Sequence, residues 1–420
     1  MTDLSFQFYA VFHTLHRYYR FGSRWVMAVT LVISAVPVMA TALIQNSFQL
    51  SLLRLFTGIS GSAFVTCQYW TSTMFTREVS GTANSIAAGW GNLGGGLAQI
   101  IIGSLFFPLF KYAYGGNSDL AWRTTCVVPA IPAIITAILI IRHSDDSPKG
   151  NYHKMKRLGT MQKVSTLKSI QEACKHLNTW ILLIHYACCF GVEITMTNAA
   201  AIYFSEEFNQ TTERAAAIAS IFGWMNLFAR GFGGFISDIM NVRMGMRGRL
   251  LWQCISLIAQ GSLVIGFSYA RDVGRAIGFM AAFSFFVQTS EGSTFSLVPY
   301  VFQRATGSVT GLVGAGGSLG GVMFMLIVRQ MGYRPAFKTM GWCVIGSAPL
   351  SALLFFKGHA SLLCGSDAPE VSSRQPKRTS NQGTNLVDES DIKGRGDVND
   401  ERTVDITGMQ QRGGVPDESI

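Results

Sequence analysis

The feature that most constrains this chain is a series of long apolar stretches, each long enough to cross a bilayer. About twenty apolar residues span the hydrocarbon core as a helix, which satisfies its own backbone polar groups where no water is available. The sequence contains ten such stretches: 25–45, 48–73, 82–110, 123–142, 179–204, 215–238, 250–270, 276–300, 306–328 and 337–356. They predict an all-α integral membrane protein that crosses the bilayer many times.

Composition agrees with this prediction and excludes other classes. Only 14% of the residues are charged, against about 25% in soluble domains. The net charge of +10 does not indicate a nucleic-acid partner, because most of the basic residues lie between the apolar stretches. The eight cysteines form no C-x-x-C pair, so we expect no metal site and no cofactor. We expect membrane lipid to surround the protein.

Charge and polarity divide the chain into five expected parts. If the polar stretch between the fourth and fifth spans is cytoplasmic, that face carries 16 Lys and Arg residues outside the tail, and the opposite face carries 8. The positive-inside rule then places both termini in the cytoplasm. The parts are a basic N-terminal segment (1–24), an incomplete four-helix bundle (25–142), a central loop (143–178), a six-helix bundle (179–356) and a disordered tail (357–420).

Two sequence patterns recur in corresponding places of the two halves. "AGWGNLGGG" (88–96) lies in the third span and "GAGGSLGG" (314–321) in the ninth; "RFGSRW" precedes the first span and "SDIMNVRMGMRGR" the seventh. Parallel six-helix repeats are typical of major facilitator transporters. The second half has six spans and the first has four, so the pattern predicts ten of twelve spans, with the first two helices absent.

The stretch Gly89–Gly94 also matches the G-x-G-x-x-G pattern of dinucleotide-binding loops. That reading needs a preceding strand and an acidic residue about twenty positions later, whereas this motif lies in a span without charge. Small residues at helical spacing instead predict close helix packing. The faces expected to form such seams are Ala87, Gly91, Gly95 and Ala98 in one half, and Gly307, Gly311, Ala315 and Ser318 in the other.

Polar residues inside apolar spans are costly and therefore candidates for function. Arg230 is the strongest, because a planar guanidinium fork matches a planar oxyanion; a structural ion pair is the alternative. Asn92 offers an amide donor that suits an anion. Arg54, Glu193 and Glu291 are candidates for proton coupling or for ion pairs, including an Arg54–Glu291 pair.

The two glycine-rich motifs resemble the paired signatures of the nitrate/nitrite porter family within the major facilitator superfamily. Leu52–Phe75, His185–Phe204 and Gly223–Asp238 also resemble that family, and the short central loop with "DDSPKGNY" resembles algal or diatom-type eukaryotic members more than fungal ones. The resemblance covers about residues 20–356. Its signature glycines are Gly89, Gly91, Gly94, Gly95, Gly314, Gly316, Gly317 and Gly320.

The resemblance implies a site as well as a fold. It implies that Arg230 binds substrate, with Tyr186, Phe190 and Phe64 as walls and with Asn92 and Ser318 as polar contacts; many members have Asn where this chain has Ser318. It also implies a second substrate arginine on a helix that precedes this chain's first span. Asp238 and the basic "NVRMGMRGR" resemble the superfamily's cytoplasmic loop motif, whose role is conformational.

The expected function is therefore secondary active transport of nitrate, and of nitrite as a further candidate, across the plasma membrane. Alternating access would carry the anion, proton coupling is implied by resemblance, and no enzymatic chemistry is expected. Two alternatives stay open: a transporter of another small anion, and a truncated, non-transporting membrane protein such as a sensor or dominant-negative fragment. A coding sequence that begins upstream of Met1 is a third explanation for the absent helices.

Overall fold

The computed structural model describes residues 22–76, 78–148, 150–151, 166–302 and 306–365, and within these every regular element is helical. Each predicted span coincides with a helical stretch. In the first half these are α2 (Ser23–Ala40) with η1 (Thr41–Leu43), α3 (Ser47–Thr57) with η2 (Gly58–Gly61) and α4 (Ser62–Met74), α5 (Ser80–Ala98) with the π-helix η3 (Gln99–Phe106) and α6 (Phe107–Ala113), and α7 (Ser118–Thr125) with α8 (Ala130–His143).

The second half follows the same plan after a short helix, α10 (Thr166–Lys175). Its elements are α11 (Leu177–Phe208), α12 (Thr212–Trp224) with η4 (Met225–Leu227) and α13 (Ala229–Met244), α14 (Met246–Tyr269), α15 (Val273–Val301), α16 (Thr306–Met331), and α17 (Tyr333–Ser347) with η6 (Ala348–Leu353). Within the described residues, seven helical segments are long and apolar enough to cross a membrane. The stretches predicted at 82–110, 276–300 and 337–356 are helical but are not among those seven.

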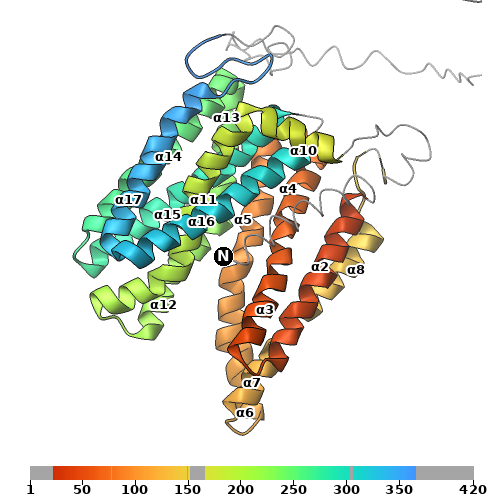
Figure 1. The fold of residues 1–420 in the computed structure, drawn as a ribbon, viewed down its shortest axis with the longest axis vertical. Helices are drawn as coiled ribbons and strands as arrows, with labels where there is room; N and C mark the ends of the chain where they lie inside the picture. The colour runs from red at the N-terminus through yellow and green to blue at the C-terminus, as the bar shows by residue number, and fades with distance from the viewer. Residues whose placement is uncertain (1–21, 77, 149, 152–165, 303–305, 366–420) are drawn as a thin grey trace, which may run out of the picture. The chain divides into compact units, whose positions relative to one another are not determined.

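Helix contacts connect the two halves through a few elements. In the first half α2 packs on α8 and α4 on α5; in the second, α11 packs on α16 and α14 on both α15 and α17 (Figure 1). The contacts between the halves run mainly from α5 to α13 and α15, and from α4 to α16. The residues that carry the functional site lie on these connecting helices and on α11.

Two segments differ from their predicted loop or tail character. The polar central loop contains α10, in which Ala173 is completely buried against the core that includes Leu182 and Val309. Apolar residues at helical spacing in "TLKSIQEACK" account for this helix. The remaining residues of that loop from 152 to 165 lie outside the described part.

Residues 356–365, most of which we assigned to the disordered tail, fold back on the start of α14. Ala360 and Ser361 are buried there, and the Ser361 hydroxyl donates to the Cys364 carbonyl at 2.7 Å. The guanidinium of Arg247 donates to the carbonyls of Ser361 (3.3 Å) and Gly365 (2.7 Å). The prediction of disorder was wrong for these residues, because a basic side chain and a hydrophobic core next to them supply partners. Residues 366–420 lie outside the described part.

Candidate functional site

A cavity of about 580 Å³ lies between helices of both halves. Its walls come from α2, α4, α5, α11 and α16. Five of the six residues that sequence reasoning assigned to substrate binding line it: Phe64, Asn92, Tyr186, Phe190 and Ser318. The structure therefore brings together residues that are up to 254 positions apart in the chain (64 to 318). Most of the other lining residues are apolar or glycine, so Asn92 and Ser318 are among its few polar contacts.

The aromatic wall of the cavity is a stack of rings. Tyr186 and Phe190 are nearly parallel, with ring centroids 5.1 Å apart and an interplanar angle of 8°, because they are one helical turn apart on α11. Phe64 on α4 extends the stack, 6.3 Å from Tyr186. Phe295 on α15 meets the rings of Tyr186 and Phe64 edge-on, at 4.8 and 5.2 Å. Sequence reasoning missed Phe295, which looks like an ordinary core residue.

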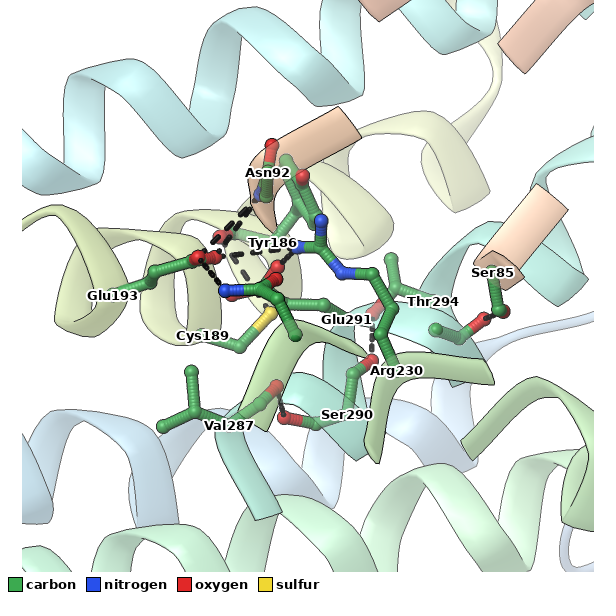
Figure 2. Close-up of polar contacts among 12 residues, drawn as sticks. Ser85, Asn92, Tyr186, Cys189, Glu193, Arg230, Val287, Ser290, Glu291 and Thr294 are labelled. Carbon is green, nitrogen blue, oxygen red and sulfur yellow. Dashed lines mark hydrogen bonds and ion pairs between the residues drawn. The ribbon is translucent and has the colours of Figure 1, made fainter. Parts of the chain in front are cut away.

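Arg230, the sixth predicted residue, lies behind the cavity wall and does not line it. Its side chain is 1% exposed, and its guanidinium forms ion pairs with Glu193 at 3.3 Å and with Glu291 (Figure 2). Two carboxylates therefore surround one cation, and with all three groups ionised the cluster carries one negative charge. The predicted Arg54–Glu291 pair is wrong. Glu291 is buried against α13, whereas Arg54 is exposed on α3 and has no ion pair within the described residues.

Glu193 connects Arg230 to the cavity. Asn226 donates from Nδ2 to Glu193 Oε1 at 2.9 Å, and Asn92 donates from Nδ2 to both carboxylate oxygens at 3.4 Å (Figure 2). Asn92 thus contacts the cavity on one side and the charged cluster on the other. The Glu193 side chain is 8% exposed and that of Glu291 is fully buried. Of the two carboxylates, Glu193 is the one with access to the cavity through Asn92.

Sequence reasoning missed Asn226, although it lies in the stretch Gly223–Asp238 that resembles the porter family. The signal was an amide four positions before Arg230, in the same apolar span. Asn226 lies in η4, the short 3-10 segment that separates α12 from α13, and its side chain is directed at Glu193 on α11. The interruption of the helix was not visible in the sequence.

The signature glycines have two different roles. A Cβ atom at Gly89 would lie 2.5 Å from the carbonyl oxygen of Asn226 and 3.2 Å from Cβ of Arg230, so glycine there lets α5 approach the charged cluster. Gly316, Gly317 and Gly320 are packed just as closely against α11. By contrast, a Cβ at Gly91 or Gly94 would meet nothing within 4 Å, and one at Gly314 would make only ordinary contacts with Phe64 and Val65.

The structure differs from the predicted helix-packing faces of small residues. Ala87, Gly91, Ala315 and Ser318, which were expected to lie in these seams, line the cavity. On α5 the seam is a different face, in which Gly81, Ser85 and Gly89 pack against α13, η4 and α15. Gly95 and Ala98 belong to α5, but their surroundings fall outside the described part.

A second charged cluster joins the two halves where α13 ends and α5 begins. Arg249 forms an ion pair with Asp238 at 2.7 Å, and Asp238 accepts hydrogen bonds from the backbone amide and the hydroxyl of Thr82, both at 2.6 Å. The Arg249 guanidinium also lies 5.4 Å from the ring of Tyr300. We call Asp238, Arg249 and Thr82 the latch. It joins the first turn of α5 to the loop motif between α13 and α14.

Two helical halves around a shared cavity are typical of secondary membrane transporters. Comparison with known proteins supports this class. Residues 4–325 match the family described as Major Facilitator Superfamily. High affinity nitrate transporter 2.5 of Arabidopsis thaliana is 35% identical over 359 residues, which cover 84% of this chain and 70% of that protein. Nitrate transporter 2.1 of Chlamydomonas reinhardtii is 36% identical over 356 residues, covering 82% and 64% of the two chains.

Less similar proteins indicate the same family and fold. The nitrate/nitrite transporter NrtP of Nostoc punctiforme is 27% identical over 401 residues, which cover 77% of each chain. Among solved structures, the proton:xylose symporter XylE has a TM-score of 0.61 at 15% identity and covers 89% of this chain; at this identity the likeness concerns the fold alone. The chain belongs to the major facilitator superfamily and, within it, to the nitrate/nitrite porter family.

Proposed function

We propose that this protein is a secondary active transporter that moves nitrate, with nitrite as a second substrate, across a membrane by alternating access. The observation that carries the proposal is Arg230, a guanidinium buried behind the wall of a cavity that helices of both halves line, and linked to that cavity through Glu193 and Asn92. Its planar fork of donors matches the planar nitrate ion. Asn92 and Ser318 supply neutral polar contacts on the cavity wall, and the aromatic stack supplies an apolar surface beside them.

The charged cluster also supports proton coupling. While Glu193 and Glu291 are both ionised, they satisfy the positive charge of Arg230 and repel an entering anion. A proton on Glu193 removes one carboxylate charge, which frees part of the guanidinium for nitrate. Because the proton and the nitrate carry opposite charges, the cluster has the same net charge before and after both have bound.

The function is tested by reconstituting the full chain in liposomes and measuring nitrate uptake driven by an inward proton gradient. We expect nitrate accumulation that collapses with a protonophore and that nitrite inhibits. Uptake of another small anion that nitrate does not inhibit would favour the first alternative. A folded, reconstituted protein that carries no anion would favour the non-transporting alternative.

Replacing Glu193 by Gln should separate substrate exchange from proton coupling. The neutral amide mimics the protonated carboxyl, so nitrate exchange between two equal pools should continue while accumulation against a gradient is lost. Counterflow and gradient-driven uptake of labelled nitrate measure the two activities. Glu207→Gln is the matched control, because Glu207 lies on the same helix but pairs with Arg334 at 3.2 Å, outside the site. Retained accumulation in Glu193→Gln would assign coupling elsewhere.

The latch should control the rate of the conformational cycle. In Asp238→Asn the ion pair with Arg249 is lost, although Asn can still accept from Thr82. We expect a several-fold lower maximum rate of nitrate uptake with a KM within about twofold of the wild type, since the latch does not contact the cavity. Asp272→Asn, which alters the cap of α15 instead, is the control. A raised KM with an unchanged maximum rate would contradict this role.

The cellular setting and the division of the chain belong to the same proposal. We place the protein in the plasma membrane with both termini in the cytoplasm, a four-helix bundle at 25–142 and a six-helix bundle at 179–356. The excess of Lys and Arg on the face of the central loop supports this orientation. On this reading the latch and Arg247 lie on the cytoplasmic side.

A further inference from the structure

We propose that Asn226 is a positioning residue that responds to the protonation state of Glu193, donating a hydrogen bond to the ionised carboxylate and accepting one from the protonated carboxyl. This inference rests on the proposed function, because it specifies how a proton on Glu193 releases Arg230 for an anion. It assigns a role to a residue outside the cavity wall.

The geometry of the Asn226 amide fits both states of its partner. Its nitrogen donates to Glu193 Oε1 at 2.9 Å, while its own oxygen is buried and has no hydrogen-bond partner among the described residues. The residue is 2% exposed. An ionised carboxylate only accepts hydrogen bonds, whereas a protonated one donates through its O–H group. Rotation of the amide by half a turn presents the free oxygen to that proton.

Few other groups can perform this exchange. The charged groups that face Glu193 from neighbouring helices are Arg230 on α13 and Glu291 on α15, and neither can alternate between donor and acceptor while ionised. On α11 itself, Tyr186 and Cys189 are the nearby titratable groups (Figure 2). A buried carboxyl group without a hydrogen-bond partner is costly in either state.

The side-chain amides of Asn92 and Asn226 both contact Glu193 but have different surroundings, which indicates different roles. Asn92 is half-buried, lines the cavity and lies 3.4 Å from the carboxylate, so it can turn toward an anion. Asn226 is closer to the carboxylate and does not line the cavity. Its backbone is fixed across the interface between the halves, since Gly89 allows α5 to lie directly against the Asn226 carbonyl. Asn226 therefore remains with Glu193 in both states.

The test is the pH dependence of nitrate uptake by the full chain in liposomes. In Asn226→Ala both states of Glu193 lose a hydrogen bond, and the bond to the ionised carboxylate is the stronger of the two, so Glu193 takes up a proton at higher pH. We expect the half-maximal pH of uptake to rise by about one unit, which is the size of the difference between a hydrogen bond to a charged group and one to a neutral group. Asn198→Ala is the control, because Asn198 is exposed on α11 and, among the described residues, donates to the backbone carbonyl of Ile194. A slower rate with an unchanged pH profile would overturn the proposal.

A second measurement makes the inference independent of the transported anion. The infrared band of a protonated carboxyl group that disappears in Glu193→Gln is followed against pH in purified protein. We expect Asn226→Ala to move this titration to higher pH and Asn226→Asp, which adds a like charge, to move it further. An unmoved band would overturn the role of Asn226. A moved band in a protein that carries no nitrate would uphold that role and reject the proposed substrate.

In the Glu193→Gln background, Asn226→Ala should produce no further shift in the pH profile, because the titrating partner is gone. An additive shift would show that Asn226 acts through another group and would overturn the proposal. Should Asn226→Ala not fold, Asn226→Ser keeps a small group that can both donate and accept. Asn226→Ser is expected to raise the half-maximal pH of uptake above that of the wild type, but by less than the shift of about one unit expected for Asn226→Ala.

Discussion

Arg230→Lys is expected to raise the KM for nitrate by about 10- to 100-fold, since one or two hydrogen bonds to a charged partner are lost. Lysine keeps the positive charge that the two carboxylates require, so the cluster stays neutralised to the same degree. It loses the planar fork, and its ammonium cannot pair with Glu193 and Glu291 in the arrangement that Arg230 adopts. Concentration-dependent uptake of labelled nitrate measures the effect.

Arg243→Lys is the matched control for this experiment. Arg243 lies on the same helix, α13, in its last turn, and its side chain is exposed. The same chemical change there should leave the KM unaltered. Unchanged kinetics in Arg230→Lys would show that positive charge alone suffices, which would remove bidentate recognition from the proposal. Arg230→Ala is less informative, because two unpaired buried carboxylates cost several kcal/mol in stability.

Gly320→Ala is expected to destabilise the protein, by roughly 1–3 kcal/mol as is typical of overpacked sites. A Cβ at this position would lie 2.7 Å from the backbone carbonyl carbon of Ala187, and backbone cannot move aside as a flexible side chain can. The contact joins α16 to α11, the helix that carries Tyr186, Phe190 and Glu193. We expect a lower melting temperature of the purified protein and reduced nitrate uptake.

Gly94→Ala makes the same chemical change in the other signature, where a Cβ would meet nothing within 4 Å. It should leave the melting temperature unchanged or raise it slightly, because alanine favours a helix over glycine by up to about 1 kcal/mol. Equal destabilisation by both changes would contradict the packing role of Gly320, because a Cβ meets backbone at Gly320 and open space at Gly94. Thermal unfolding of the two variants in the same detergent distinguishes these outcomes.

The sequence predicted much of the fold because a bilayer imposes a simple length rule. All ten apolar stretches are helical, and membership of the porter family is confirmed by the relatives. The aromatic residues and Asn92 were assigned to one site through the resemblance to the porter family, and they line one cavity. Arg230, assigned to the same site because a charge is costly in its span, lies behind the cavity wall.

The pairings of these residues could not be predicted. Arg54, Glu193 and Glu291 are equally unusual in an apolar sequence, yet two are buried against Arg230 and the third is exposed. Which face of a helix meets which neighbour depends on rotations about the helix axis that composition does not record. For the same reason, Ala87 and Gly91, which were expected to form a seam on α5, proved to line the cavity, and Asn226 and Phe295 passed unnoticed.

The interruption at η4 has a mechanical consequence. Arg230 and Asn226 lie next to the break between α12 and α13. A force on the guanidinium therefore acts at the point where these two helices can tilt relative to each other. The arm formed by α12 has 13 residues and is about 20 Å long, so a tilt of about 10° moves its far end by about 3 Å. That displacement exceeds the radius of a water molecule. Binding of a small anion at Arg230 can thereby displace the far end of α12 without any large motion at the charged cluster.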